Sequence, residues 1–300
     1  MSTAIAKTIV ATGATSGLGF EMVKQLLSQV DQPYRLILGA RDTAKARTDF
    51  DSLGFDAARH SLTVLPLELT DLAGVRTFAK KALEDLGRSD DGRLDYLVLN
   101  AAAAFPAETG DPNRSKWCDA YTINYLSQHY LTHLLREKLV ASRSRIVVVS
   151  TGAVQNVPDP STLADTLKLG SGATSWKTYP ASKFLQLLTA HWWRRELHGV
   201  CDVVAVSPGM IPGTGLGRGA DFKAPANVMS SAKSIPTGAS SILEALFRKD
   251  FPDDPDRIFL TSWGEWWPAS EISASLDKQL QNGWSPSKGE IEREASLPAE

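Results

Sequence analysis

The sequence predicts an α/β fold in a single domain, in which helices cover both faces of a doubly wound parallel sheet. Apolar, strand-like runs alternate with helical segments over the first two-thirds of the 300 residues. Several runs, such as residues 94–99 and 146–149, are almost entirely apolar, as strands buried on both faces must be. A glycine-rich turn separates the first run from the first helical segment. Such alternation implies right-handed crossovers between parallel strands.

Each element follows from its local pattern. Short apolar runs bounded by polar or turn residues predict strands, and apolar residues at helical spacing between them predict helices. The expected strands are residues 7–12, 34–41, 62–67, 94–99, 145–150 and 200–206. The expected helices are residues 18–29, a short one from about 43, and then 72–86, 116–140 and 179–197.

Two long segments interrupt the alternation. Residues 151–176 contain Pro158 and Pro160 and are expected to be irregular, apart from a short helix near residues 163–169. Residues 208–236 are rich in Gly, Pro and Ser and show no period. Loops of this length inside a compact domain are usually functional.

Composition argues against several kinds of partner. The formal net charge is −2, so the chain offers no electrostatic footprint for nucleic acid. No apolar run approaches the ~20 residues of a membrane span. The N-terminal residues run straight into the first strand, so no signal or transit peptide is expected. Cys118 and Cys201 are the only cysteines, which favours a reducing compartment and a cytoplasmic location.

The turn after the first strand has the composition of a phosphate-binding loop. Its residues are Thr12, Gly13, Ala14, Thr15, Ser16, Gly17, Leu18 and Gly19. Glycine allows a tight turn and lets the backbone approach a pyrophosphate. The helix that follows presents free N–H groups and the positive end of its dipole to the phosphates. A strand, turn and helix in this order predict a dinucleotide site in a Rossmann fold.

The end of the second strand predicts which dinucleotide binds. NAD-binding folds usually place an acid there to accept hydrogen bonds from the ribose hydroxyls. In this sequence Gly39 and Ala40 leave room where the acid would stand, and Arg41 offers a planar cation suited to a 2′-phosphate. The alternative is a solvated arginine whose charge Asp42 cancels. We favour NADP(H) as the cofactor.

A phenol and an ammonium lie four residues apart, at Tyr179 and Lys183, on one face of the last predicted helix. Tyrosine has an ordinary pKa near ~10 and is a poor proton shuttle at neutral pH. A fixed cation nearby would lower that pKa towards the working range. Lys183 can also bind the nicotinamide ribose. The same spacing arises by chance on helix surfaces, so the pair needs support from its surroundings.

Further segments supply that support. The fifth strand ends at Ser150 and Thr151, the fourth is followed by Asn100, and the long helix contains Asn124. Pro208-Gly209-Met210-Ile211-Pro212-Gly213-Thr214 follows the sixth strand. With the glycine spacing and the Tyr-x-x-x-Lys pair, these residues resemble the short-chain dehydrogenase/reductase family over about residues 7–215. The resemblance is nearest to its retinol-dehydrogenase-like and protochlorophyllide-reductase-like branch, and more loosely to fungal biosynthetic reductases.

The resemblance implies a role for each matching residue. Tyr179 would be the acid/base, and Lys183 its tuner and a ribose ligand. Thr151 or Ser150 would donate a hydrogen bond to the carbonyl oxygen, and Asn124 would hold a water that links Lys183 to solvent. Besides Tyr179 and Lys183, the implied cofactor contacts are Gly13, Thr15, Ser16, Gly17, Leu18, Gly19, Arg41, Glu68, Leu69, Asn100, Ala101, Pro208, Gly209, Ile211 and Thr214.

The sequence departs from the family pattern at four places. Thr151 stands where the family usually has serine. Leu99-Asn100-Ala101-Ala102 replaces the family's Asn-Asn-Ala-Gly segment. Glu68 replaces the aspartate that usually meets the adenine, and the threonine of the capping loop is displaced by one residue to Thr214. None of these changes removes the acid/base pair.

The domain therefore divides into a cofactor-binding core at residues 7–206, a substrate loop at 207–236 and an appendage at 237–300. Apolar side chains in the long segments, among them Phe222 and Val228, favour a lid formed by residues 151–176 and 208–236, of which residues 213–231 should be mobile without ligand.

We expect an NADPH-dependent reductase that converts a ketone or aldehyde to an alcohol on a small, mostly apolar substrate, in secondary metabolism. An alcohol dehydrogenase working in the oxidative direction is the first alternative. A non-redox cofactor-binding sensor or scaffold is the second, although it would not need Tyr179 and Lys183. His129 and His133 have the spacing of zinc ligands but no evident third ligand, so no metal is expected. The sequence leaves open whether the chain forms a homodimer or a homotetramer.

Overall fold

The computed structural model describes residues 5–88, 92–218 and 229–298. Within these residues, seven parallel strands form one sheet in the order β3-β2-β1-β4-β5-β6-β7. The strands are β1 (Lys7–Thr12), β2 (Tyr34–Ala40), β3 (Ser61–Pro66), β4 (Tyr96–Leu99), β5 (Arg145–Val149), β6 (Asp202–Val206) and β7 (Phe259–Leu260). The predicted α/β fold with a doubly wound sheet is confirmed. The strand order reverses between β1 and β4, which is where such sheets bind ligands.

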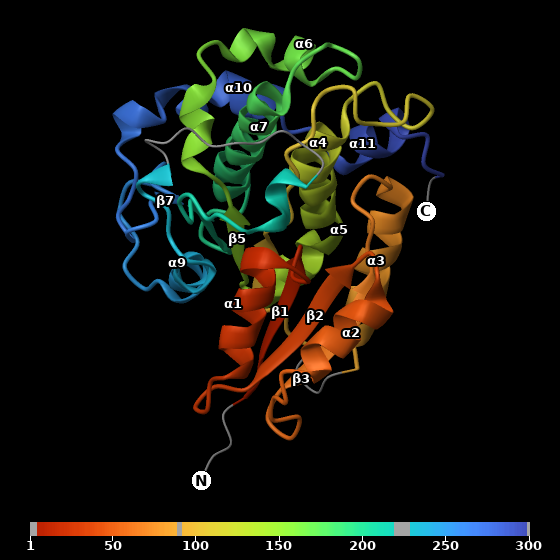
Figure 1. Ribbon diagram of the computed structural model, residues 1–300, viewed down its shortest axis with the longest axis vertical. Coiled ribbons are helices and arrows are strands. Elements are labelled where there is room, and N and C mark those ends of the chain that lie inside the picture. Colours follow the sequence, from red (N-terminus) through yellow and green to blue (C-terminus); the bar gives the residue numbers. More distant parts are fainter. Residues whose placement is uncertain (1–4, 89–91, 219–228, 299–300) are drawn as a thin grey trace.

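Helices cover both faces of the sheet (Figure 1). They are α1 (Gly17–Leu27), α2 (Thr43–Asp51), α3 (Leu72–Leu86), α4 (Asp119–Tyr121), α5 (Ser127–Ser142), α6 (Leu163–Leu167), α7 (Ser175–Glu196), α9 (Ile235–Phe247), α10 (Lys278–Gly283) and α11 (Lys288–Glu294). The apolar residues of α1, α2 and α9 pack in one buried cluster, and those of α3, α5 and α7 in another. None of the helices in the described residues combines the length and the apolar character that a membrane span requires.

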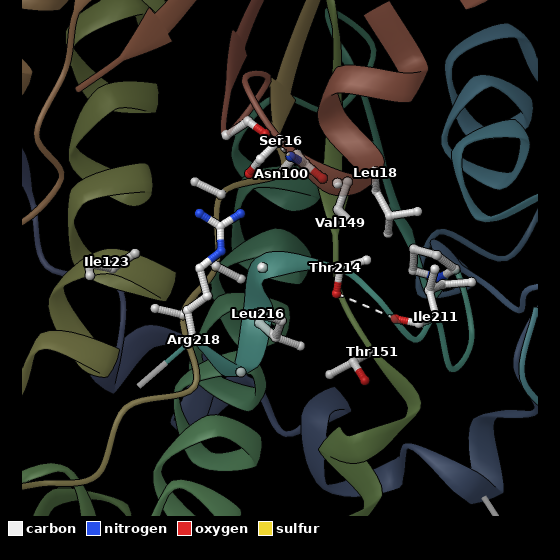
Figure 2. Close-up of a pocket in the computed structure, with 18 of the residues that line it drawn as sticks. Ser16, Leu18, Asn100, Ile123, Val149, Thr151, Ile211, Thr214, Leu216 and Arg218 are labelled. Carbon is white, nitrogen blue, oxygen red and sulfur yellow. Dashed lines mark hydrogen bonds between the residues drawn. The ribbon is translucent and has the colours of Figure 1, made fainter. Parts of the chain in front are cut away.

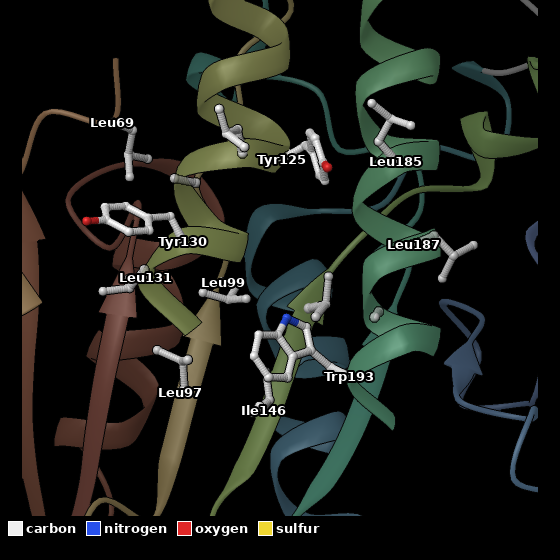
Figure 3. Packing of buried hydrophobic residues seen from close by; sticks show 14 of the residues in the cluster. Leu69, Leu97, Leu99, Tyr125, Tyr130, Leu131, Ile146, Leu185, Leu187 and Trp193 are labelled. Carbon is white, nitrogen blue, oxygen red and sulfur yellow. The ribbon is translucent and has the colours of Figure 1, made fainter. Parts of the chain in front are cut away.

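The strands explain why there are two clusters. Successive side chains of a strand point to opposite faces. Val98 and Val147 therefore pack with α1 and α9, whereas Leu97, Leu99 and Ile146 pack with α5 and α7. Figure 3 shows this second cluster, with Tyr130, Leu131 and Trp193 of the helices lying over the sheet. Because both faces are covered, these strands have no polar face, as their sequences predicted.

Two of the predicted helices differ most from their predicted bounds. The helix predicted at residues 179–197 begins earlier, at Ser175, so Tyr179 lies in its second turn. The added turn is anchored where Thr178 donates its hydroxyl to the Phe105 carbonyl at 2.5 Å. The helix predicted at residues 116–140 begins at Asp119 and contains a π-helical turn at Thr122–Leu126, between α4 and α5. Turns of this kind are frequent at functional sites.

The C-terminal residues complete the sheet and its helical layers. β7 pairs with β6 through Ala205↔Phe259 and Val206↔Leu260, and α9 packs on α1, β5 and β6. The sequence predicted neither β7 nor α9. Further along, α10 packs on α7 and α11 on α5, and Figure 1 shows both at the end of the molecule opposite the N-terminus.

Candidate active site

A cavity of about 880 Å³ opens at the carboxyl ends of the central strands. Many predicted site residues border it: Gly13, Thr15, Ser16, Gly17, Leu18, Arg41, Glu68, Leu69, Asn100, Ala101, Ser150, Thr151, Tyr179, Lys183, Pro208, Gly209, Ile211 and Thr214. Gly19 and Asn124 do not border it. Figure 2 shows part of this wall, with Ser16 and Asn100 on one side and Thr151 on the other. Of the predicted lid, residues 219–228, with Phe222 and Val228, lie outside the described residues.

The glycine turn is fixed by close backbone contacts. Gly13 has a φ of +62°, and a Cβ there would lie 2.6 Å from the Ala101 Cα. A Cβ on Gly19 would lie 2.2 Å from the Gly13 carbonyl oxygen, so this glycine lets α1 pack against the turn. Asn100 donates its side-chain amide to the same carbonyl oxygen at 2.8 Å. Ser16 is the N-cap of α1 but makes no side-chain capping bond, so its hydroxyl stays free to meet an anion.

The residues at the end of β2 support the NADP(H) interpretation in one respect and correct it in another. Arg41 is exposed on the cavity wall, and no described residue accepts a hydrogen bond from its guanidinium. Asp42 forms no ion pair with Arg41 in the described structure; its carboxylate caps α2 by accepting from the Lys45 N–H at 2.9 Å. However, Gly39 does not leave open room. A Cβ on Gly39 would lie 2.3 Å from the Leu67 Cδ2, so Leu67 fills that space.

Tyr179 lies on α7 at the cavity wall, with 7% of its surface exposed. Burial raises the pKa of its phenol to about 12, and a hydrogen bond with the Thr151 side chain acts in the opposite direction. The neighbouring Ser150 Oγ is buried and has no hydrogen-bond partner among the described residues. Of the two predicted hydroxyls, the one beside the phenol is therefore that of Thr151.

Lys183 is 1% exposed and lies one turn after Tyr179. Its Nζ donates to the Val149 carbonyl at 2.5 Å and to the Gln186 Oε1. Burial lowers the pKa of this ammonium to about 7. In this geometry burial, and not Lys183, sets the direction of the Tyr179 pKa shift, so the predicted lowering by Lys183 is not seen. The ammonium donates to two neutral oxygens instead of the phenol, and burial dominates both groups.

Asn124 lies in the π-helical turn and is completely buried. Its Oδ1 accepts from the Ala103 N–H at 2.7 Å, and its amide donates to the Ala103 carbonyl at 2.8 Å and to the Ser182 Oγ at 2.9 Å. Both amide N–H groups are thus used within the protein. The side chain joins the segment after β4 to α7 beside Lys183, and its geometry differs from the predicted water-holding role.

A family model described as short chain dehydrogenase matches residues 7–162, which is just over half of the chain. The chain belongs to the short-chain dehydrogenase/reductase family. It is therefore an oxidoreductase, as its sequence predicted.

Other members of the short-chain dehydrogenase/reductase family resemble the chain over most of its length. It is 51% identical over 294 residues to a short-chain dehydrogenase/reductase of Pestalotiopsis microspora, covering 97% of this chain and 100% of the relative. It is 30% identical to the chloroplastic protochlorophyllide reductase of Pisum sativum, covering 91% of this chain and 72% of that one. The solved structure of NADPH-bound carbonyl reductase from chicken fatty liver has a TM-score of 0.62, 20% identity, and coverage of 87% and 98%. This last likeness shows the shared fold.

In this short-chain dehydrogenase/reductase, the cavity also contains residues that the sequence did not predict. Arg218 and Met229 border it from the segment between β6 and α9, and Phe105 and Ile123 border it from other segments. Arg218 lies in a stretch without a hydrophobic period, so the sequence pattern did not predict its position on the cavity wall. The available signal was a cation four residues after Thr214, in a loop already expected to meet the cofactor.

Proposed function

We propose that this oxidoreductase uses NADPH to reduce a ketone or aldehyde to an alcohol on a small, mostly apolar substrate. The observation that carries the proposal is the arrangement of Tyr179 and Thr151. Both side chains border the cavity that the glycine turn also borders, and a hydrogen bond with Thr151 opposes the effect of burial on the pKa of the phenol. A proton donor and a dinucleotide-type phosphate loop thus share one space.

The residues present fit a dinucleotide phosphate. The glycine turn has no side chain at Gly13, where a Cβ would collide with Ala101. The free Ser16 hydroxyl and the N–H groups of the first turn of α1 could meet the pyrophosphate. Arg41 is exposed and unpaired among the described residues, which supports a 2′-phosphate and hence NADPH over NADH. When bound, NADPH would supply a hydride to the carbonyl carbon.

The chain's own residues would supply the proton. With a pKa of about 12, Tyr179 stays protonated at neutral pH and can donate to a carbonyl oxygen. Thr151 places a second hydroxyl beside it, and donors fixed in advance stabilise a developing oxyanion without reorganisation. Lys183 uses two of its donors on Val149 and Gln186, which leaves a third N–H for a ribose hydroxyl.

The direction and the substrate class rest on further observations. A phenol with a raised pKa is a poor base at neutral pH, which favours reduction over alcohol oxidation. A sensor would have no use for the hydroxyl pair. The cavity wall also contains Phe105, Met210 and Leu216, which supports an apolar substrate. A place in secondary metabolism stays a prediction.

Tyr179→Phe tests the proposal. The variant keeps the ring and removes the hydroxyl, so it should bind NADPH as the wild type does and lose about 10²–10⁴-fold in kcat. The measurement is nicotinamide absorbance during turnover with a panel of carbonyl compounds, together with a binding titration. A Tyr179→Phe enzyme that kept most of the wild-type rate would refute the role of the phenol. An absence of reduction across the panel would refute the activity.

A further inference from the structure

Arg218 is a second arginine on the cavity wall, and it comes from the segment after β6. Its guanidinium rests against Gly215, where an added Cβ would lie 2.5 Å from the Arg218 Nη2. Figure 2 shows the side chain extending towards the side of the cavity where Ser16 and Asn100 lie. No described residue accepts a hydrogen bond from this guanidinium. The cation is therefore directed at the glycine turn without a protein partner there.

The segment that positions Arg218 is fixed on both sides of the cavity. We call residues 208–218 the strap. Thr214 of the strap covers the start of α1, since a Cβ on Gly17 would lie 3.4 Å from the Thr214 Cβ. Beyond it, the Leu216 carbonyl accepts from the Ala104 N–H, in the segment after β4, at 3.1 Å. The strap thus crosses the cavity, and Arg218 lies at its C-terminal end.

The charges around this crossing favour an anion between Arg218 and α1. The N-terminus of α1 presents N–H groups and the positive end of a helix dipole, and the Ser16 hydroxyl is free. The one acidic group of the described wall, Glu68, is bonded to the Thr70 N–H and hydroxyl, both at 3.1 Å. Two positive features thus face each other without a carboxylate bonded to either.

We propose that Arg218 binds the pyrophosphate of the dinucleotide from the side opposite the N-terminus of α1. The proposal rests on the proposed function, because it takes the dinucleotide as the ligand of this cavity. The guanidinium presents parallel N–H donors suited to two phosphate oxygens. Arg41 contacts the end of the cofactor that differs between NADP and NAD, whereas Arg218 contacts the pyrophosphate, which both cofactors have.

Binding titrations distinguish the two arginines without turnover. Dissociation constants for NADPH and for NADH are measured by quenching of tryptophan fluorescence in the wild type, Arg218→Ala, Arg218→Lys and Arg41→Ala. Arg218→Ala should weaken both dinucleotides by a similar factor, about 10–100-fold, and Arg218→Lys by less, since a point charge keeps attraction but loses the paired donors. Arg41→Ala should weaken NADPH alone. Arg114→Ala, which removes an exposed arginine outside the cavity, is the matched control and should change neither.

A second variant tests the geometry. Gly215 does not have a positive φ, so Gly215→Ala is compatible with the backbone, but its methyl would displace the guanidinium. Gly215→Ala should weaken both dinucleotides, and the double variant Gly215→Ala/Arg218→Ala should be no weaker than Arg218→Ala alone. Full additivity of the two changes would overturn the assigned contact.

The remaining outcomes are decisive against the proposal in different ways. A loss confined to NADPH in Arg218→Ala would assign the residue to the 2′-phosphate. Unchanged dissociation constants with a raised KM for the carbonyl compound would assign it to an acidic substrate group. Equal dissociation constants of wild type and Arg218→Ala for both dinucleotides, with no change in KM, overturn this proposal alone. Failure of the wild type to bind either dinucleotide overturns the proposed function and this proposal with it.

Discussion

Thr151 and Ser150 are adjacent in the sequence but have different neighbours. They leave the end of β5 with side chains on opposite sides, as consecutive residues of an extended chain do. The Thr151 hydroxyl reaches the Tyr179 phenol, while the Ser150 Oγ is buried without a partner among the described residues. The sequence left the choice between them open because both hydroxyls arrive at the same edge of the sheet.

Paired substitutions at this position test which hydroxyl acts. Thr151→Val keeps the shape of the side chain and removes the donor, so kcat should fall about 10²–10³-fold. Ser150→Ala removes a hydroxyl that has no partner to lose, so kcat should stay within a few-fold and the free energy of unfolding should not fall. Steady-state kinetics and denaturant titration of both variants measure these effects. A larger loss of kcat in Ser150→Ala than in Thr151→Val would reverse the assignment.

At the scale of elements, α5 binds the C-terminal segment through two neutral histidines, one of which also contacts α7. His129 and His133 of α5 both contact the Pro286 carbonyl, at 2.9 and 3.1 Å, and the Trp193 indole N–H of α7 donates to His129 Nδ1 at 3.0 Å. Burial lowers the pKa of His129 to about 3 and that of His133 to about 4. These histidines do not border the cavity, and their contacts are structural. Among the described residues, no group of three or more potential metal ligands surrounds them.

This docking should make the protein sensitive to acid. The folded pKa values lie below 6.5, so between pH 6.5 and about 4 the unfolded chain binds more protons than the folded one. Stability is therefore full above pH 6.5 and falls as the pH drops through this window, by up to about 1.4 kcal/mol per pH unit for each histidine. His133→Gln should make the fall shallower, because glutamine can still donate to Pro286 and does not titrate. Denaturant unfolding of the wild type and of His133→Gln from pH 4 to pH 8 measures how the free energy of unfolding depends on pH. Parallel pH profiles for the two proteins would contradict the assignment.

At the scale of the whole molecule, the residues after α9 are part of the folded core. β7 covers the edge of β6, and its Phe259 stacks on Trp267 with ring centroids 5.3 Å apart. Without β7, strand β6 would become an exposed apolar edge strand, which favours association with other chains. α11 contributes less, since Ile291 is its only buried residue.

Two truncations separate these contributions. A chain that ends at residue 257 lacks β7 and should aggregate or fail to fold. A chain that ends at residue 287 lacks α11 and should remain folded and monodisperse, with a free energy of unfolding lower by about 1.5–3 kcal/mol from the loss of Ile291 burial. Size-exclusion chromatography and circular dichroism measure both. A folded, monodisperse chain ending at residue 257 would show that the C-terminal residues are dispensable.

The features that the sequence predicted are local in the chain. The glycine turn and the Tyr179–Lys183 pair are each contained within a few residues, so spacing alone reveals them. Asn124 was identified as a site residue, but its partners Ala103 and Ser182 are distant in sequence, so its contacts could not be predicted from the sequence. β7 has only two residues and no period. The lowered pKa of Lys183 depends on burial by several elements, which spacing does not report.

The side chains around the cavity have a consequence for the speed of cofactor capture. The chain as a whole has a formal net charge of −2, yet Arg41, Lys183 and Arg218 border the cavity against the single carboxylate of Glu68 among the described residues. A recess with an excess of one sign of charge, in a weakly charged surface, concentrates field lines and draws in ligands of the opposite sign. Dinucleotides are anions, so their association rate should decline as ionic strength rises and the Debye length shortens.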